Sequence, residues 1–145
     1  QHLELEITET AVMQDLESAV EQLRELRRSG ARIPIDDIRT CHSALSYLKR
    51  FPLDSVKIDR TFVRDLPGDV DDAAITRAII AMAHSLRLKV IAEGVETGEE
   101  QSFLRELKCD EMQGYLFSRP LPEDEFLRLL QGVVDSGGKP ALQRA

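Results

Sequence analysis

Acidic side chains follow short apolar segments at several points in this chain of 145 residues. In the stretch "RIPIDDIRT", the alternating Ile33 and Ile35 run directly into two adjacent aspartates, Asp36 and Asp37. Adjacent carboxylates repel each other, and carboxylate oxygens are ligands that hard divalent cations prefer. Two such cations about 3.5–4 Å apart suit in-line displacement at phosphorus. The aspartate pair therefore predicts a two-metal site for phosphate chemistry.

A lysine and further acids recur at three other apolar segments. Glu6 ends the first segment, Lys57 and Asp59 lie in a later one, and Glu93 and Glu96 follow another. Catalytic groups drawn from the ends of several strands are typical of a (β/α)₈ barrel. Buried carboxylates are costly unless they are compensated, so their convergence at one mouth also calls for cations.

Each signal has an ordinary explanation when it is taken alone. An Asp-Asp pair is often a helix cap or a solvated turn, and a Lys-x-Asp motif is often a surface ion pair of little energetic value. Glu93 alone could be a turn residue. The recurrence of such residues at matching strand ends favours a functional site. We interpret His2, His42 and His84 as surface or helix residues because they fall at no strand end.

The hydrophobic periodicity predicts alternating strands and helices. The predicted strands are 3–8, 31–36, 54–59, 89–96 and 114–118, and the predicted helices are 12–26, 43–51, 73–86, 97–107 and one that begins at Pro122. Gly30 is placed to end the first helix, and Thr97 with Glu100 has the spacing of a capping box. The inward residues of the helix 73–86 are expected to be Ile75, Ala78, Ile79 and Met82.

This alternation implies parallel strands joined by right-handed crossovers. An open doubly wound sheet and a barrel both fit, but no Gly-rich phosphate loop follows any strand. We therefore predict an α/β fold, a TIM-like (β/α)₈ barrel of which this chain supplies about the last five strand–helix units. The period-two pattern directs Glu4, Glu6 and Lys57 into the barrel, and Val56 and Ile58 toward the helices.

Composition and charge exclude several classes of protein. The chain is 42% hydrophobic and 31% charged, which indicates one globular unit, and no apolar run approaches the roughly 20 residues of a membrane span. The net charge of −7 argues against a nucleic-acid backbone as partner. We expect no DNA binding and no membrane contact by this segment. Cys41 and Cys109 match no disulfide or metal spacing, which indicates a reducing cytoplasm. The chain begins at Gln1 without a signal-like region, so we expect it to be part of a longer protein.

Five motifs, in order and spacing, resemble those of the EAL-domain phosphodiesterases that act on the bacterial second messenger cyclic di-GMP. They are "LEIT", "IDDIRT", "VKIDRTFV", "VIAEGVET" and "QGYLFSRPLP". The resemblance runs from Leu3 to about Leu130. It implies that residues 1–131 are the C-terminal part of an EAL domain and that 132–145 form a flexible tail. The implied activity is hydrolysis of cyclic di-GMP to linear pGpG.

The resemblance also implies a set of metal ligands for two divalent cations, Mg²⁺ or Mn²⁺. Glu6 looks like the glutamate on the first metal, and Asp36 looks like the aspartate that contacts both metals. Asp37 and Glu93 resemble ligands around the second metal.

Further roles follow from the same resemblance. Lys57 matches the lysine that orients the attacking water, and Asp59 matches a nearby acid, so with Glu93 they form the implied catalytic set. Gln113 matches the glutamine close to the metal–water cluster. Glu9 and Glu96 resemble glutamates that brace the loop after the paired aspartates.

Two departures from the family pattern matter for activity. The name-giving Glu-Ala-Leu strand, and an asparagine on the strand after it, would lie upstream of Gln1. The loop after the paired aspartates, typically Phe-Gly-Thr-Gly in the family, here reads Ile38-Arg39-Thr40-Cys41. Arginine and cysteine do not replace glycine cheaply where the backbone needs positive φ. The alternative is therefore a degenerate domain that binds cyclic di-GMP as a receptor, or acts as an interaction module, without cleaving it.

The family also implies partners. We expect a homodimer formed through EAL domains and a fusion to upstream GGDEF or sensory domains. The protein is then cytoplasmic or the cytoplasmic part of a membrane-anchored sensor. Because five units cannot close an eight-stranded barrel, we expect the isolated chain to be inactive.

Overall fold

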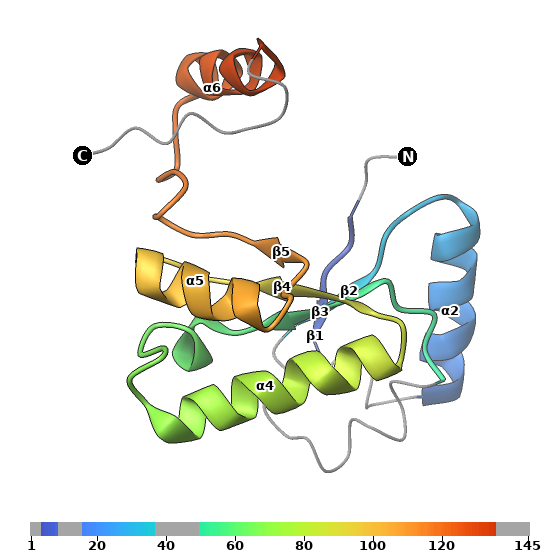
Figure 1. Ribbon diagram of the computed structural model, residues 1–145. Helices are drawn as coiled ribbons and strands as arrows, with labels where there is room; N and C mark the ends of the chain where they lie inside the picture. Colours follow the sequence, from blue (N-terminus) through green and yellow to red (C-terminus); the bar gives the residue numbers. More distant parts are fainter. Residues whose placement is uncertain (1–3, 9–15, 37–49, 136–145) are drawn as a thin grey trace.

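The structure of the protein, a computed structural model, describes residues 4–8, 16–36 and 50–135 (Figure 1). Along the chain the elements are β1 (Ile7–Thr8), α2 (Leu16–Arg28), β2 (Pro34–Asp36), β3 (Ser55–Ile58), a short 3₁₀ helix η1 (Arg60–Phe62), α4 (Val70–Ser85), β4 (Lys89–Ala92), α5 (Gly98–Glu106), β5 (Glu111–Met112) and α6 (Glu123–Asp135). The predicted helix 43–51 falls mostly outside the described residues.

The strands form one parallel sheet in the order β1-β2-β3-β4-β5. Each neighbouring pair is parallel, with Thr8 opposite Asp36 between β1 and β2 and Lys57 opposite Ile91 between β3 and β4. An isolated bridge between Glu4 and Arg32 extends the first pairing toward the start of the chain. The predicted alternation of parallel strands and helices is therefore confirmed.

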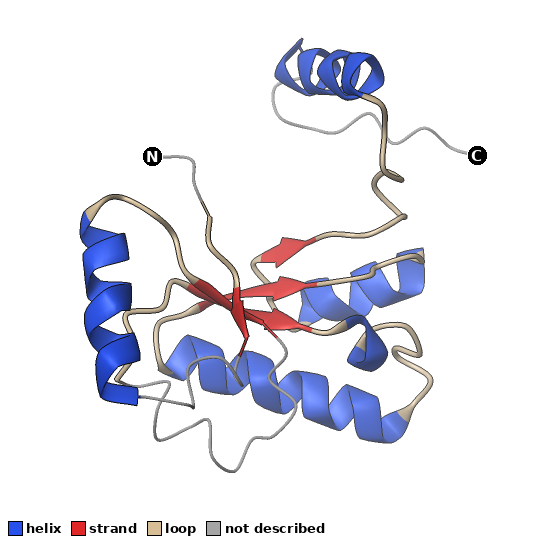
Figure 2. Ribbon diagram, turned by 180° about the vertical axis from the view of Figure 1, so that it is seen from behind, coloured by secondary structure: helices blue, strands red, loops and turns tan. Residues whose placement is uncertain are grey.

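Helices α4 and α5 cover one face of the sheet. They lie in front of the strands in Figure 1 and behind them in Figure 2. The core on this face contains Val56 and Ile58 of β3, Ile79 of α4 and Leu104 of α5. Lys57 and Ile91 are also buried but lie outside this cluster, because successive side chains of a strand point to opposite faces.

The helix ends follow local sequence signals. Asp69 caps α4 by accepting hydrogen bonds from the backbone amides of Asp71 and Asp72. The predicted capping box is confirmed at α5, where the Thr97 side chain accepts from the Glu100 amide and the Glu100 carboxylate accepts from the Thr97 amide.

Two predictions about the elements are wrong. Residues 114–118 form a turn rather than a strand, because the chain folds over Val95 at Gly114, where a Cβ would overlap the Val95 backbone. Strand β5 lies just before this turn. In α4, Ala78 is exposed and Ile75 is 37% exposed. Of the other residues predicted to point inward, Ile79 is buried and Met82 packs against the core. The buried residues of α4 are Ala73, Thr76, Ile79, Ile80 and Ala83.

Cys109 lies in the segment between α5 and β5. The thiol is free, and its Sγ donates to the Glu111 carbonyl oxygen at 3.3 Å. Burial raises the pKa of Cys109 to about 11, so the reactive thiolate is scarce at neutral pH.

Helix α6 lies apart from the sheet, beyond an extended segment that follows β5 (Figure 1). Phe126, Leu127 and Leu130 on this helix are exposed. The helix continues to Asp135, past the predicted domain end at residue 131. No helix in the described part of the chain is long and apolar enough to cross a membrane.

Candidate active site

Lys57 is the centre of an ion-pair cluster near the C-terminal end of the sheet. Its side chain is only 5% exposed and points away from the helix-facing core. The Nζ atom lies 2.7 Å from Oε1 of Glu6 and also contacts Oε1 of Glu93. Residues from before β1, within β3 and after β4 therefore meet at one ammonium group.

Gln113 joins this cluster from the end of β5. Its Nε2 atom donates to Oε1 of Glu93 at 2.9 Å. The backbone fixes this arrangement, because the Glu93 amide donates to the Ile58 carbonyl and the Gln113 amide donates to the Ala92 carbonyl. The sheet therefore sets the positions of Lys57, Glu93 and Gln113 relative to one another.

Electrostatics keep Lys57 in its charged form. Burial opposes the charge, but hydrogen bonds from Lys57 to Glu6 and Glu93, together with their negative charges, outweigh burial and raise the pKa of Lys57 above its ordinary value. A protonated lysine donates hydrogen bonds and cannot accept a proton. In this form Lys57 can orient a water or a phosphate oxygen.

Asp36 lies on the same face of the sheet as Lys57. It ends β2 and is half-buried. The register pairs Ile35 with Val56, so the next step along both strands brings Asp36 level with Lys57. Asp37 and Glu9, the other predicted members from the first half of the chain, lie outside the described residues.

Asp59 and Glu96 make contacts that the sequence did not predict. Asp59 caps the N-terminus of η1, where its Oδ1 accepts from the amide and the hydroxyl of Thr61 at 2.9 and 2.6 Å. Glu96 forms an ion pair with Arg60, with Nη2 2.7 Å from Oε1. Their predicted roles beside the metals and in bracing the loop remain predictions.

The chemistry of the donors fits divalent cations. Glu6 and Glu93 direct carboxylate oxygens at one positive charge, and hard oxygen donors of this kind are what Mg²⁺ and Mn²⁺ prefer. Within residues 4–8, 16–36 and 50–135, no three acidic, histidine or cysteine side chains gather closely enough to form a metal site by themselves. Within these residues, Glu6 and Glu93 therefore do not form a metal site by themselves.

A cavity of about 480 Å³ opens beside Glu93 and Gln113. Arg60, Tyr115 and Arg119 also line it, and the Arg119 guanidinium lies 4.6 Å from the centre of the Tyr115 ring. Sequence reasoning did not single out these three residues. The available signal was their position inside the motifs "VKIDRTFV" and "QGYLFSRPLP", where cationic and aromatic side chains stand beside the predicted site residues.

Known proteins resemble this chain in sequence and in fold. The chain is 52% identical over 129 residues to the cyclic di-GMP phosphodiesterase NbdA of Pseudomonas aeruginosa, covering 87% of this chain and 16% of NbdA. The solved structure of the MucR phosphodiesterase in complex with c-di-GMP, from the same species, matches with a TM-score of 0.80 and 46% identity over 86% of this chain and 51% of that one. A manganese and c-di-GMP complex of Klebsiella pneumoniae BlrP1 matches with a TM-score of 0.72 and 38% identity over 81% of this chain and 30% of that one.

The chain therefore spans less than a fifth of the length of NbdA and about half of the solved MucR chain. The predicted fold, the later strand–helix units of a TIM-like α/β barrel, is confirmed by the parallel sheet and by these structural matches. The family profile of the EAL domain matches residues 1–120. This chain belongs to the EAL domain family.

Proposed function

We propose that the protein containing this chain hydrolyses cyclic di-GMP to linear pGpG in bacterial second-messenger signalling. The observation that carries the proposal is the ammonium of Lys57 held between Glu6 and Glu93, with Gln113 bonded to Glu93. The named activity of NbdA, and the c-di-GMP in the MucR complex, give the substrate class.

The chain's own residues have distinct tasks in this proposal. Lys57 donates to the attacking water and helps to offset charge that develops on the phosphoryl group. Glu93 accepts from Lys57 and Gln113, which fixes its carboxylate for a water or a cation. Glu6, Asp36, Asp37 and Glu93 would hold the cations. Divalent cations, when bound, supply Lewis-acid stabilisation at phosphorus and activation of water.

A receptor that binds cyclic di-GMP without cleaving it is the second candidate. The observation that favours it is the loop Ile38-Arg39-Thr40-Cys41, which replaces the family's Phe-Gly-Thr-Gly. If this loop impairs the enzyme, glycine at positions 39 and 41 should raise the rate or tighten the binding of Mn²⁺.

The deciding experiment uses the full-length protein with Mg²⁺ or Mn²⁺ and cyclic di-GMP, and separates pGpG by chromatography. We expect turnover by the wild type and a loss of at least a hundredfold in Asp36→Asn with an unchanged melting temperature, because a ligand charge is removed with little change in volume. Binding of cyclic di-GMP is measured in parallel by calorimetry. Binding without turnover by the wild type would favour the receptor, and near-normal turnover by Asp36→Asn would contradict the metal assignment.

Several wider features belong to the same proposal. We infer two cations rather than one, a homodimer formed through EAL domains, a cytoplasmic location and a fusion to GGDEF or sensory domains. The name of MucR, a bifunctional diguanylate cyclase and phosphodiesterase, supports the fusion. The division into an EAL segment at 1–131 and a tail at 132–145 also remains a proposal. The 145-residue chain alone should not hydrolyse the substrate, and activity should appear when the rest of the domain is added in trans.

A further inference from the structure

Arg60 crosses from the end of β3 to the turn that follows β4. It is the first residue of η1, and its guanidinium pairs with the Glu96 carboxylate at 2.7 Å. Both side chains are partly exposed, at 57% for Arg60 and 38% for Glu96. An exposed pair of this kind adds little to the free energy of unfolding, so its importance must be sought in geometry.

The aliphatic part of the Arg60 side chain, its stem, packs against Gly94. The φ of Gly94, +69°, lies in the left-handed region, and a Cβ at this position would overlap the Cβ, Cγ and Cδ atoms of Arg60. The stem therefore lies directly against the Gly94 backbone. The turn 93–96 is in this way held at Gly94 by packing and at Glu96 by charge, both through Arg60.

The same turn begins at Glu93, which contacts Lys57 and Gln113. Backbone bonds also hold this segment, from the Glu93 amide to Ile58, from the Val95 amide to Gln113 and from the Leu116 amide to Val95. The Glu96 amide donates to the Glu100 carboxylate at 2.7 Å, and Val95 is buried in the core. These contacts fix the main chain toward the sheet and α5, while Arg60 contacts it from the side of η1. Arg60, Glu93 and Glu96 all line the cavity of about 480 Å³.

We propose that Arg60 is a positioning residue, which holds the turn 93–96 so that the Glu93 carboxylate stays between Lys57 and Gln113. The inference rests on the proposed phosphodiesterase activity, to which it adds a residue outside the predicted site. In this role Arg60 acts through Glu96 and Gly94. Its loss should therefore lower kcat rather than weaken the binding of the substrate.

The test measures kcat and KM of the full-length protein for wild type, Arg60→Met, Arg60→Lys, Glu96→Gln and the double variant Arg60→Met/Glu96→Gln. We expect Arg60→Met to lower kcat about tenfold with KM within twofold, because methionine keeps much of the stem but loses the charge. Arg60→Lys should recover most of the rate. Glu96→Gln should lower kcat as much as Arg60→Met does. The double variant should be no slower than either single variant, because all three variants lose the same ion pair between Arg60 and Glu96.

A matched control is Arg64→Met, which removes the exposed ion pair between Arg64 and Asp65 at 2.8 Å, outside the cavity lining. It should leave kcat and KM within twofold of wild type. An unchanged kcat in Arg60→Met, a higher KM with the same kcat, or additive losses in the double variant would each overturn the proposal. If the wild type itself does not hydrolyse the substrate, the proposed function fails, and a crystal structure of Arg60→Met still decides the inference. Loss of the 2.9 Å bond from Gln113 to Glu93 supports it, and an unmoved Glu93 overturns it.

Discussion

The two ends of the parallel sheet use charged side chains in different ways. At the C-terminal end, Glu6 and Glu93 both contact the ammonium of Lys57. At the N-terminal end, an aspartate instead satisfies the backbone. Asp54, just before β3, accepts from the Ile33 amide at 3.0 Å and pairs with Arg27 of α2 at 3.1 Å.

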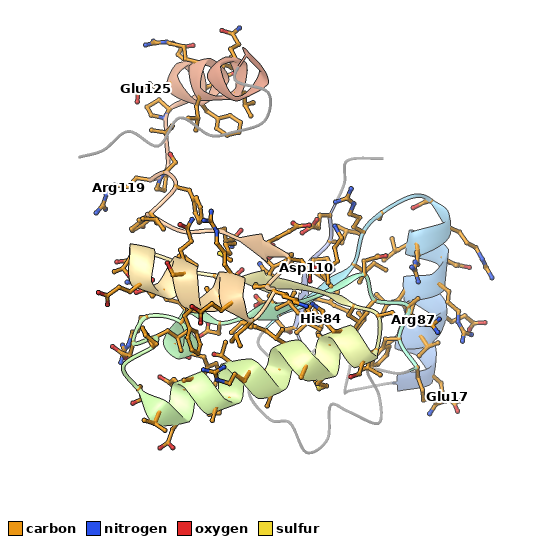
Figure 3. The ribbon with its side chains drawn as sticks, viewed as in Figure 1. Glu17, His84, Arg87, Asp110, Arg119 and Glu125 are labelled. Carbon is orange, nitrogen blue, oxygen red and sulfur yellow. The ribbon has the colours of Figure 1, made fainter. Side chains whose placement is uncertain are left out.

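This aspartate arrangement occurs twice. Asp110, just before β5, accepts from the Val90 amide at 2.9 Å and pairs with Nε2 of His84 at 3.0 Å (Figure 3). Arg27 lies in the last turn of α2, and His84 lies in the last turn of α4. In both cases the aspartate does not precede the next strand along the chain but the one that follows it. At the N-terminal end of the sheet, Asp54 and Asp110 thus each connect a helix to the backbone of a neighbouring strand or loop. The cluster of Lys57, Glu6 and Glu93 at the C-terminal end is instead held through side-chain contacts, which leaves these groups able to rearrange around a ligand.

The largest effect is expected at Lys57. Lys57→Met keeps the volume but removes the cation between Glu6 and Glu93, so we expect kcat of the full-length protein to fall about 10³-fold, within the range for a lost catalytic hydrogen-bonding group. The melting temperature should change little because Glu6 is exposed and can turn to water. A variant that keeps more than a tenth of the wild-type kcat would contradict the assignment of Lys57 to the site.

The opposite outcome is expected at the N-terminal end. Asp54→Ala and Asp110→Ala each leave a backbone amide without its acceptor, and each should lower the free energy of unfolding by about 1–2 kcal/mol. The kcat should stay within twofold of wild type. Chemical denaturation gives the first quantity and the phosphodiesterase assay gives the second.

Glu111→Ala, at the start of β5, is a control for these two variants. It breaks the exposed pair of Lys89 and Glu111 at 3.0 Å but leaves no backbone amide unsatisfied, so its effect should be below about 0.5 kcal/mol. If Glu111→Ala were as destabilising as Asp110→Ala, the distinction between backbone-satisfying and surface charges would be wrong.

The pH dependence of stability should also reveal Asp110. Partial burial alone would raise the pKa of its carboxyl, but hydrogen bonds from His84 and Val90, with the charges of His84 and Lys89, hold the pKa below its ordinary value. A depressed folded pKa gives stability that is present above the unfolded value, about 3.9, and is lost as pH falls through the folded pKa. The difference in unfolding free energy between wild type and Asp110→Asn should therefore shrink below about pH 4. A difference independent of pH would show that the charge of Asp110 does not contribute.

The features that the sequence predicted correctly depend on local patterns. The alternation around Lys57 placed its side chain opposite Val56 and Ile58, and the spacing of Thr97 and Glu100 predicted a capping box that the structure confirms. These features need only the chain geometry of a strand or of a first helical turn. The barrel followed from the order of such elements.

The features that the sequence did not reveal depend on contacts between distant residues. Arg60 meets Glu96, and Asp110 meets His84 and the Val90 amide, only after β3, β4 and β5 have paired. The turn 114–118 was predicted as a short strand, whereas the close approach of Gly114 to Val95 is a tertiary contact. Periodicity within one segment carries no information about such contacts.

Three residues at the N-terminal end of the sheet have a positive φ. Gly30 follows α2 with φ of +93°, Arg87 follows α4 with φ of +61°, and Lys108 follows α5 with φ of +62°. Each ends its helix in the left-handed region, which costs a residue with a Cβ about 1–2 kcal/mol. Of the three residues only Gly30 avoids this cost, because glycine has no Cβ.

The smallest effect is therefore expected from exchanging glycine among these positions. Arg87→Gly and Lys108→Gly should each raise the free energy of unfolding by about 0.5–1 kcal/mol, because relief of the left-handed strain exceeds the extra unfolded-state entropy of glycine. Both side chains are exposed, so little packing is lost. The reverse change, Gly30→Ala, should lower the free energy of unfolding by about 1 kcal/mol through backbone strain alone, since no other atom lies within 4 Å of the added Cβ. Urea denaturation measures all three variants, and kcat should stay unchanged, because none of these positions touches the cluster around Lys57. If Lys108→Gly destabilised the protein, a contact of the lysine would outweigh its backbone strain.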